Sequence, residues 1–231
     1  GYAPESLDTI LPGHPFDVLA SSLAQRAIVM ALRGHGARVD EDQACAMHRM
    51  HTLDNPATSF QVLVHLCIAR FELGDHDGVL PLLADLRELV ERNEMARLYV
   101  ELWHGWATAR TDDLAKGLSI MARARKKGTQ YPLWIPSALM LEVDLLIGAG
   151  RHHEALALLD DCDAQIDRPR HTYLLAEAKR RRAACLSARG GANAEIEALL
   201  GEAVRIAAAQ GTRRFEEAAR QDLDRHRQRG P

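Results

Sequence analysis

Turns recur along the 231-residue chain at a nearly constant interval, and this regularity constrains its fold more than any single segment does. Each turn separates two runs of residues whose apolar positions follow helical spacing. The turns inside successive helical pairs lie 38, 38, 38 and 40 residues apart, at Gly36, Gly74, Asp112, Gly150 and Gly190. Because one helical pair cannot bury its apolar faces alone, a repeat of this kind predicts a stacked array, an α-solenoid.

A second position supports the same register. Seven residues before each turn stands a small or β-branched residue, which would let two helices approach closely: Val29, Cys67, Gly105, Val143 and Ala183. We therefore expect an all-α fold, a right-handed superhelix of about five helical hairpins closed by a terminal helix over Arg213 to Arg227. Residues 1–12 are expected to form an N-terminal extension, and residues 13–231 the helical repeat domain.

The composition of the chain excludes several classes of function and partner. Hydrophobic residues make up 47% of the chain, enough for a core, and 29 basic against 32 acidic residues give a net charge of -3. A chain of this charge exerts no overall attraction on polyanions, so we expect no direct nucleic-acid binding by this region. No apolar run approaches the length of a membrane-spanning helix, so no membrane partner is expected. The four cysteines are dispersed among apolar residues, which indicates reduced thiols and a cytoplasmic location.

The chain carries little that points to catalysis. His48 and His51 lie one helical turn apart, with Cys45 a further turn back, but no nearby carboxylate or cysteine pair completes a metal site. No nucleophile elbow of the Gly-x-Ser-x-Gly type occurs, and no cysteine has an activating local signature. We expect neither an enzyme nor a cofactor or metal. A metal-dependent or hydrolytic enzyme is an alternative that rests on the count of eleven histidines alone.

The scarce aromatic residues cluster on one predicted helix. Tyr99, Trp103 and Trp106 are spaced by four and three residues and share a face. Burial in the seams between repeats is the favoured interpretation, since large aromatics usually bury. The alternative is a concave groove lined by the first helix of each pair, where aromatics and arginines anchor partners. The candidate binding residues on these first helices are Arg70, Tyr99, Trp103, Trp106, Trp134, Glu142 and Arg182, with Glu101 and Arg180 as weaker candidates.

Four consecutive cations, Lys179 to Arg182, form the most concentrated basic run that we weighed as a site. They cannot all face one direction on a helix, and a solvated charged face is the favoured interpretation. Arg182 precedes the small packing residue Ala183, a position from which it would point into the concave surface. The run also keeps an RNA-binding solenoid open as a further alternative.

Several segments resemble known helical repeats. The stretch Gly150 to Asp160, with Glu154-Ala155-Leu156 after its turn, resembles the start of a second helix in tetratricopeptide repeats, although the period here exceeds their 34 residues. Three further segments are similar to the C-terminal helical region of bacterial STAND-type signalling ATPases: Leu102 to Ala107, Ala176 to Arg180 and Ala198 to Gly211. The chain has no phosphate-binding loop of the Gly-x-x-x-x-Gly-Lys-Ser/Thr type.

This resemblance implies a non-catalytic sensor module of a bacterial signal-transduction or transcriptional regulator. Its concave groove would recognise a peptide, a partner protein or a small effector, and the ligand would shift the population of array conformations. The alternative is a constitutive protein–protein scaffold or homo-oligomerisation module, which the same repeats would build.

Overall fold

The computed structural model describes residues 15–111, 113–128, 135–166 and 172–228. Over these ranges the chain is all-α, with eleven α-helices and no β-strand, as the sequence predicts. It divides into two compact units, one ending at Val100 and the other beginning at Glu101. No helix within the described ranges is long and apolar enough to cross a membrane.

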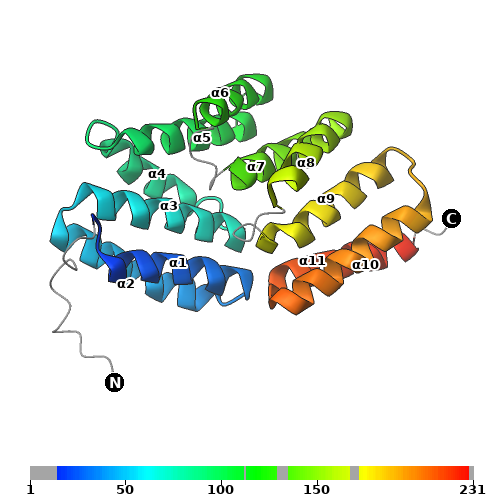
Figure 1. The fold of residues 1–231 in the computed structure, drawn as a ribbon, viewed down its shortest axis with the longest axis horizontal. Coiled ribbons are helices and arrows are strands. Elements are labelled where there is room, and N and C mark those ends of the chain that lie inside the picture. Colours follow the sequence, from blue (N-terminus) through cyan, green and yellow to red (C-terminus); the bar gives the residue numbers. More distant parts are fainter. Residues whose placement is uncertain (1–14, 112, 129–134, 167–171, 229–231) are drawn as a thin grey trace. The chain divides into compact units, whose positions relative to one another are not determined.

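The helices follow one another with short connections (Figure 1). Their bounds are α1 Val18–Leu32, α2 Gly36–Leu53, α3 Pro56–Leu73, α4 Val79–Glu88, α5 Glu94–Thr111, α6 Leu114–Lys127, α7 Ile135–Gly148, α8 His152–Ile166, α9 Leu175–Ala188, α10 Asn193–Gln210 and α11 Arg213–Gln228. A short 3-10 helix, η3 (Thr172–Leu174), leads into α9. Five helical pairs and a terminal helix therefore confirm the predicted tetratricopeptide-like α-solenoid.

Left-handed glycines mark four of the five predicted turns, and they correct the register of the first. Gly74, Gly150 and Gly190 have positive φ angles, as does Gly34, whereas the predicted turn residue Gly36 already begins α2. Counting seven residues back from Gly34 gives Ala27, which is fully buried. The prediction that Val29 packs between helices is therefore wrong, because Val29 is 45% exposed. Its counterparts Cys67, Val143 and Ala183 are buried as expected.

One residue, Asp17, ties the first three helices of unit 1 together. Asp17 caps α1, because its carboxylate accepts the Ala20 N–H at 2.7 Å. Arg49 of α2 donates to the same carboxylate at 2.7 Å, and the Asp17 N–H donates to the Thr58 hydroxyl of α3 at 2.8 Å. The polar groups at the start of α1 therefore join this helix to both α2 and α3.

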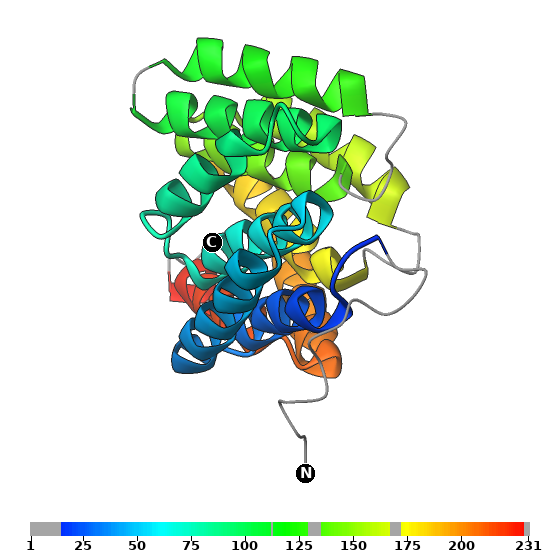
Figure 2. The same ribbon diagram turned by 90° about the vertical axis from the view of Figure 1, so that its left-hand side faces the viewer.

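In unit 2, α5 and α6 approach closely enough that their backbones nearly touch. Figure 2 shows them as adjacent antiparallel green helices. The contact is built from two glycines: a Cβ placed on Gly105 would lie 2.9 Å from the Gly117 carbonyl oxygen, and one on Gly117 would lie 2.4 Å from the Ala109 nitrogen. The small residue predicted at position 105 therefore does allow a close helix crossing.

The rest of unit 2 is built on two apolar clusters. The first joins α7, α8 and α9 through buried residues such as Leu139, Val143 and Leu159. The second joins α9 to α10 through Ala183, Ile196 and Leu200, with Leu223 of α11 packed against it.

All four cysteines are free thiols, and burial raises the pKa of the Cys67 and Cys162 thiols to about 12.

Candidate functional site

The predicted binding residue of unit 1, Arg70, is engaged within its own unit. Its side chain is 13% exposed and lies 2.8 Å from the Asp40 carboxylate and 3.1 Å from that of Asp75. Its Nε also donates to the Gln43 side-chain oxygen at 2.8 Å. Arg70 thus links α3 to α2 and to the turn that follows α3.

The predicted aromatic residues lie in contact with other rings. Tyr99 makes an edge contact with Phe60 of α3, at 5.5 Å between ring centroids. Trp103 and Trp106 are almost fully buried and pack edge to face at 5.4 Å, with the Arg110 guanidinium 4.8 Å above the Trp106 ring. The remaining aromatic candidate, Trp134, lies outside the described residues.

Glu142 lies in the interior of unit 2, where it is only 3% exposed. Arg125 of α6 donates to both of its carboxylate oxygens, at 2.9 and 3.3 Å. Burial raises the pKa of Glu142, although the charge and hydrogen bonds of Arg125 lower it in part. The carboxylate therefore joins α6 to α7, and its ionisation is disfavoured by its surroundings.

Replacing Glu142 with glutamine tests this balance. Because the pKa of Glu142 in the folded state is raised above its ordinary value of 4.5, its protonated form stabilises the fold. This contribution is complete below pH 4.5 and is lost as the pH rises through the pKa of the folded state. At pH 7 the Glu142→Gln variant should thus be within about 1 kcal/mol of the parent, or more stable, because glutamine keeps an acceptor for Arg125, whose side chain is 25% exposed and is not left as a buried charge. Urea unfolding at pH 7 measures this, and a loss of several kcal/mol would contradict it.

The four cations of the run Lys179–Arg182 point in different directions around α9, and each of them forms an ion pair with a carboxylate. Its outer members reach neighbouring helices: Lys179 lies 3.0 Å from Glu202 of α10, and Arg182 lies 2.8 Å from both Asp160 and Asp163 of α8. Four consecutive helical residues cover about 300° of the helix circumference, which explains why no two of them share a direction. Arg182, a predicted site residue, is thus bound to carboxylates of the preceding hairpin.

The two middle cations bind the buried carboxylate of Glu177. Arg180 donates to Glu177 at 2.8 Å and to Asp222 of α11 at 2.9 Å. Arg181 donates to Asp144 of α7 at 2.7 Å and also to Glu177. Burial raises the pKa of Glu177, but the charges and hydrogen bonds of Arg181 and Arg180 outweigh burial and hold it below its ordinary value. Through this network α9 binds α7 and α11.

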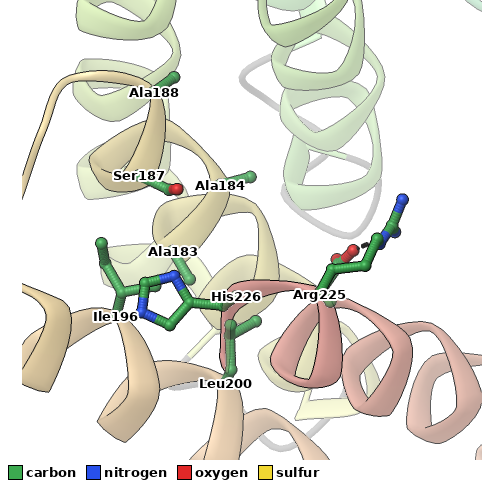
Figure 3. A pocket seen from close by; sticks show the side chains of 9 residues that line it. Ala183, Ala184, Ser187, Ala188, Ile196, Leu200, Arg225 and His226 are labelled. Atoms are coloured by element: carbon green, nitrogen blue, oxygen red, sulfur yellow. Dashed lines mark hydrogen bonds and ion pairs between the residues drawn. The ribbon is translucent and has the colours of Figure 1, made fainter. Parts of the chain in front are cut away.

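Next to this network, α9, α10 and α11 enclose a pocket of about 250 Å³ (Figure 3). Its lining is mixed: α9 contributes mostly small side chains, α10 contributes branched apolar ones, and α11 contributes polar and charged ones. Figure 3 shows the His226 ring beside Ile196 and Ala183. The complete lining is Ala183, Ala184, Ser187, Ala188, Ile196, Leu200, Asp222, Arg225 and His226.

The polar groups that line this pocket come from α11, except for Ser187, which belongs to α9. The Asp222 carboxylate accepts hydrogen bonds from Arg180 and Arg225, which holds it in place. Ser187, Arg225 and His226 add hydroxyl, guanidinium and imidazole groups. Ligand sites usually combine apolar side chains with a few polar groups that orient the ligand, and this pocket contains both kinds. At this volume it fits an aliphatic side chain with adjacent polar atoms.

Sequence reasoning identified Ala183 as a close-packing position but not the pocket beside it. Available signals were the small residues Ala183, Ala184, Ser187 and Ala188 on one helix, opposite the amphipathic α11. Small residues at successive turns leave a hollow unless the facing helix supplies bulk. The facing residues of α11 are the polar side chains Arg225 and His226, and they line the hollow without filling it.

The histidine candidates for a metal site lie on the surface of α2. Cys45, His48 and His51 are all exposed. In the described part of the chain, no group of three or more histidine, cysteine, aspartate or glutamate side chains is arranged to hold a metal ion.

Comparison with known proteins identifies a solved structure with the same fold. No protein-family model matches the sequence, and no curated protein is similar to it. The crystal structure of Bacillus thuringiensis PlcR in complex with the peptide PapR7 and DNA is similar over 91% of this chain and 77% of that chain, with a TM-score of 0.69. The two sequences are 15% identical, so the likeness establishes the tetratricopeptide-like fold.

This likeness corrects one expectation. We expected no direct nucleic-acid binding by this region, because its net charge is -3. The similar structure is that of a protein bound to DNA as well as to a peptide, so the exclusion does not hold. The physical reason is that net charge sums the whole chain, whereas nucleic-acid contact depends on a local basic surface.

Proposed function

We propose that this chain is the peptide-sensing module of a bacterial transcriptional regulator, acting in the cytoplasm. The observation that carries the proposal is the pocket between α9, α10 and α11, which is lined by both apolar and polar side chains, in a fold similar to that of a peptide-bound and DNA-bound protein. A peptide would place an aliphatic side chain against Ile196 and Leu200. Ser187, Arg225 and His226 would bind its backbone carbonyl or carboxylate oxygens.

The pocket also suggests how a bound ligand would change the arrangement of the helices. Asp222 lines it and accepts a hydrogen bond from Arg180, which belongs to the network that joins α9 to α7 and α11. A ligand seated against Asp222 and Arg225 would favour one arrangement of α11 relative to α9. In a STAND-type parent protein, which the sequence motifs resemble, the same movement would gate an ATPase.

Filling the pocket tests its role. Leucine at position 184 would occupy the hollow from α9, so the Ala184→Leu variant should fold normally and bind peptide about tenfold more weakly or worse, because the ligand loses a buried side chain. The control is Ala198→Leu, at an exposed position of α10 outside the pocket lining. The probe is a synthetic library of short peptides with aliphatic, acidic or basic C-terminal residues, measured by calorimetry.

Two results would overturn the proposal: no library peptide binds the parent chain, or Ala184→Leu binds peptides as tightly as Ala198→Leu. If the parent binds no peptide but its mass by light scattering rises with concentration, the scaffold alternative replaces the sensor.

A further inference from the structure

Two polar side chains of the pocket between α9, α10 and α11 are left available to a ligand. Ser187 and His226 line this pocket, and within the described part of the chain no hydrogen bond or ion pair engages the Ser187 hydroxyl or the His226 ring. Asp222, in contrast, already accepts hydrogen bonds from Arg180 and Arg225. The hydrogen-bonding capacity that remains for a ligand therefore lies mainly with Ser187 and His226.

These two groups lie beside the apolar part of the pocket. Ser187 comes four residues after Ala183 on α9, so both point to the same side of that helix. Figure 3 shows the His226 ring beside Ala183 and Ile196, whereas the Arg225 side chain points away from that ring. A ligand group bonded to the ring or to the hydroxyl would therefore bring its neighbouring atoms against the branched side chains of α10.

The available groups favour a ligand that accepts hydrogen bonds. A serine hydroxyl offers one donor, and a protonated histidine ring offers two. The carboxylate acceptor of the pocket, Asp222, already has its charge compensated by two guanidinium groups. A peptide amide would bring an N–H donor that finds no free acceptor of this strength, whereas a carboxylate brings two acceptor oxygens and no donor. The donor set of the pocket therefore matches a carboxylate.

The charges around the His226 ring make its protonation state matter for such a ligand. The side chains that α9 and α10 contribute to the pocket lining are uncharged. The charged groups next to the lining are joined in ion pairs: Asp222 with Arg225 and Arg180, Glu197 with Arg227, and Glu177 with Arg180. Because these carboxylates are already paired, a proton on the ring adds a positive charge that a ligand carboxylate would neutralise.

We propose that Ser187 and His226 make the pocket selective for peptides that carry a carboxylate beside an aliphatic side chain. This inference rests on the proposed function and names the class of peptide that the pocket takes. The aliphatic side chain packs on Ile196 and Leu200, while the carboxylate bonds to the hydroxyl and the ring. Histidine side chains generally take up a proton between about pH 8 and pH 5, so binding should strengthen as the pH falls across this range.

The test is calorimetry of the full chain with the tightest-binding library peptide that has an aliphatic C-terminal residue, at about pH 5.5 and about pH 7.5. The peptide is made as the free acid, as the C-terminal amide, and as the amide with a glutamate before the last residue. At the lower pH the free acid should bind about tenfold more tightly than the plain amide. Tight binding by the glutamate form would identify an acidic side chain as a second source of the carboxylate.

Two variants assign the effect to the named residues. His226→Gln keeps a polar side chain that gains no proton, so it should bind the free acid equally at both pH values. Ser187→Ala should weaken the free acid about fivefold at both pH values and keep the pH dependence. The matched control is His48→Gln, which removes an exposed histidine of α2 and should behave as the parent does.

The outcomes separate this inference from the proposed function. Equal binding of the acid and the amide, or a pH dependence that persists in His226→Gln, would overturn the carboxylate assignment and leave peptide sensing in place. The same holds if library peptides bind but none with an aliphatic C-terminal residue does. If no library peptide binds the parent at either pH, both proposals are wrong.

Discussion

Replacing Gly117 with alanine should destabilise unit 2 by about 3 kcal/mol, although alanine is the better helix former. The new Cβ would lie 2.4 Å from the Ala109 nitrogen, 2.5 Å from the Ala109 Cβ and 2.5 Å from the Gly105 carbonyl oxygen. Two of these atoms belong to the backbone, so no side-chain rotation relieves the contact, and α5 and α6 must separate. Urea unfolding followed by tryptophan fluorescence reports on this unit, because all three tryptophans lie after residue 100.

The same substitution at Gly201 should stabilise the protein instead of destabilising it. Gly201 lies within α10, and a Cβ there would meet no atom within 4 Å. The Gly201→Ala variant should be more stable by about 0.5 to 1 kcal/mol, since only the helix propensity and the unfolded state change. Equal effects at the two glycines would show that α5 and α6 do not cross as closely as described.

Replacing Arg181 with methionine should cost about 3 kcal/mol, because it leaves Glu177 buried with one of its two cations missing. Glu177 is 3% exposed, and Arg181 also provides the hydrogen bonds to Asp144 that join α9 to α7. Methionine keeps most of the apolar length of the side chain, so the loss reports on the charge network. The control is Arg213→Met, whose ion pair with Glu217 is exposed and should be worth less than about 1 kcal/mol.

The pH dependence of stability provides a second readout of this network. The pKa of Glu177 is lowered, so its contribution is complete above the ordinary value of 4.5 and is lost as the pH falls through the folded value. In Arg181→Met the pKa of Glu177 should rise, and the loss of stability in acid should shrink. If both proteins lose the same stability below pH 4.5, Glu177 and Arg181 are not coupled.

The fold was predictable because its signal is repeated. Turn residues at a period near 38 mark the same hairpin five times, and four of the five predicted positions lie between helices. The one error in register, Gly36 in place of Gly34, arose because two glycines flank His35 and sequence alone does not show which is left-handed. Burial of Ala27 then decides between them.

The site was less predictable, because it depends on which side chains meet across helices. Charge patterning placed Arg182 on a first helix but could not show that Asp160 and Asp163 of the preceding hairpin bind it. The pocket depends on small residues of α9 meeting Arg225 and His226 of α11, which are far apart in the sequence. The repeat predicts the scaffold because its signal is local spacing. A pocket forms only where the side chains of facing helices do not fill the space between them, and local spacing does not show this.

Peptide sensing is tested most directly by amide hydrogen exchange of the chain with and without a bound peptide from the library. Binding in the pocket predicts slower exchange in α9 around residues 183–188, in α10 around 196–200 and in α11 around 222–226. The effect should be absent in Ala184→Leu and present in Ala198→Leu. Protection confined to α5 and α7, or no peptide-dependent protection anywhere in the chain, would contradict peptide binding at this site.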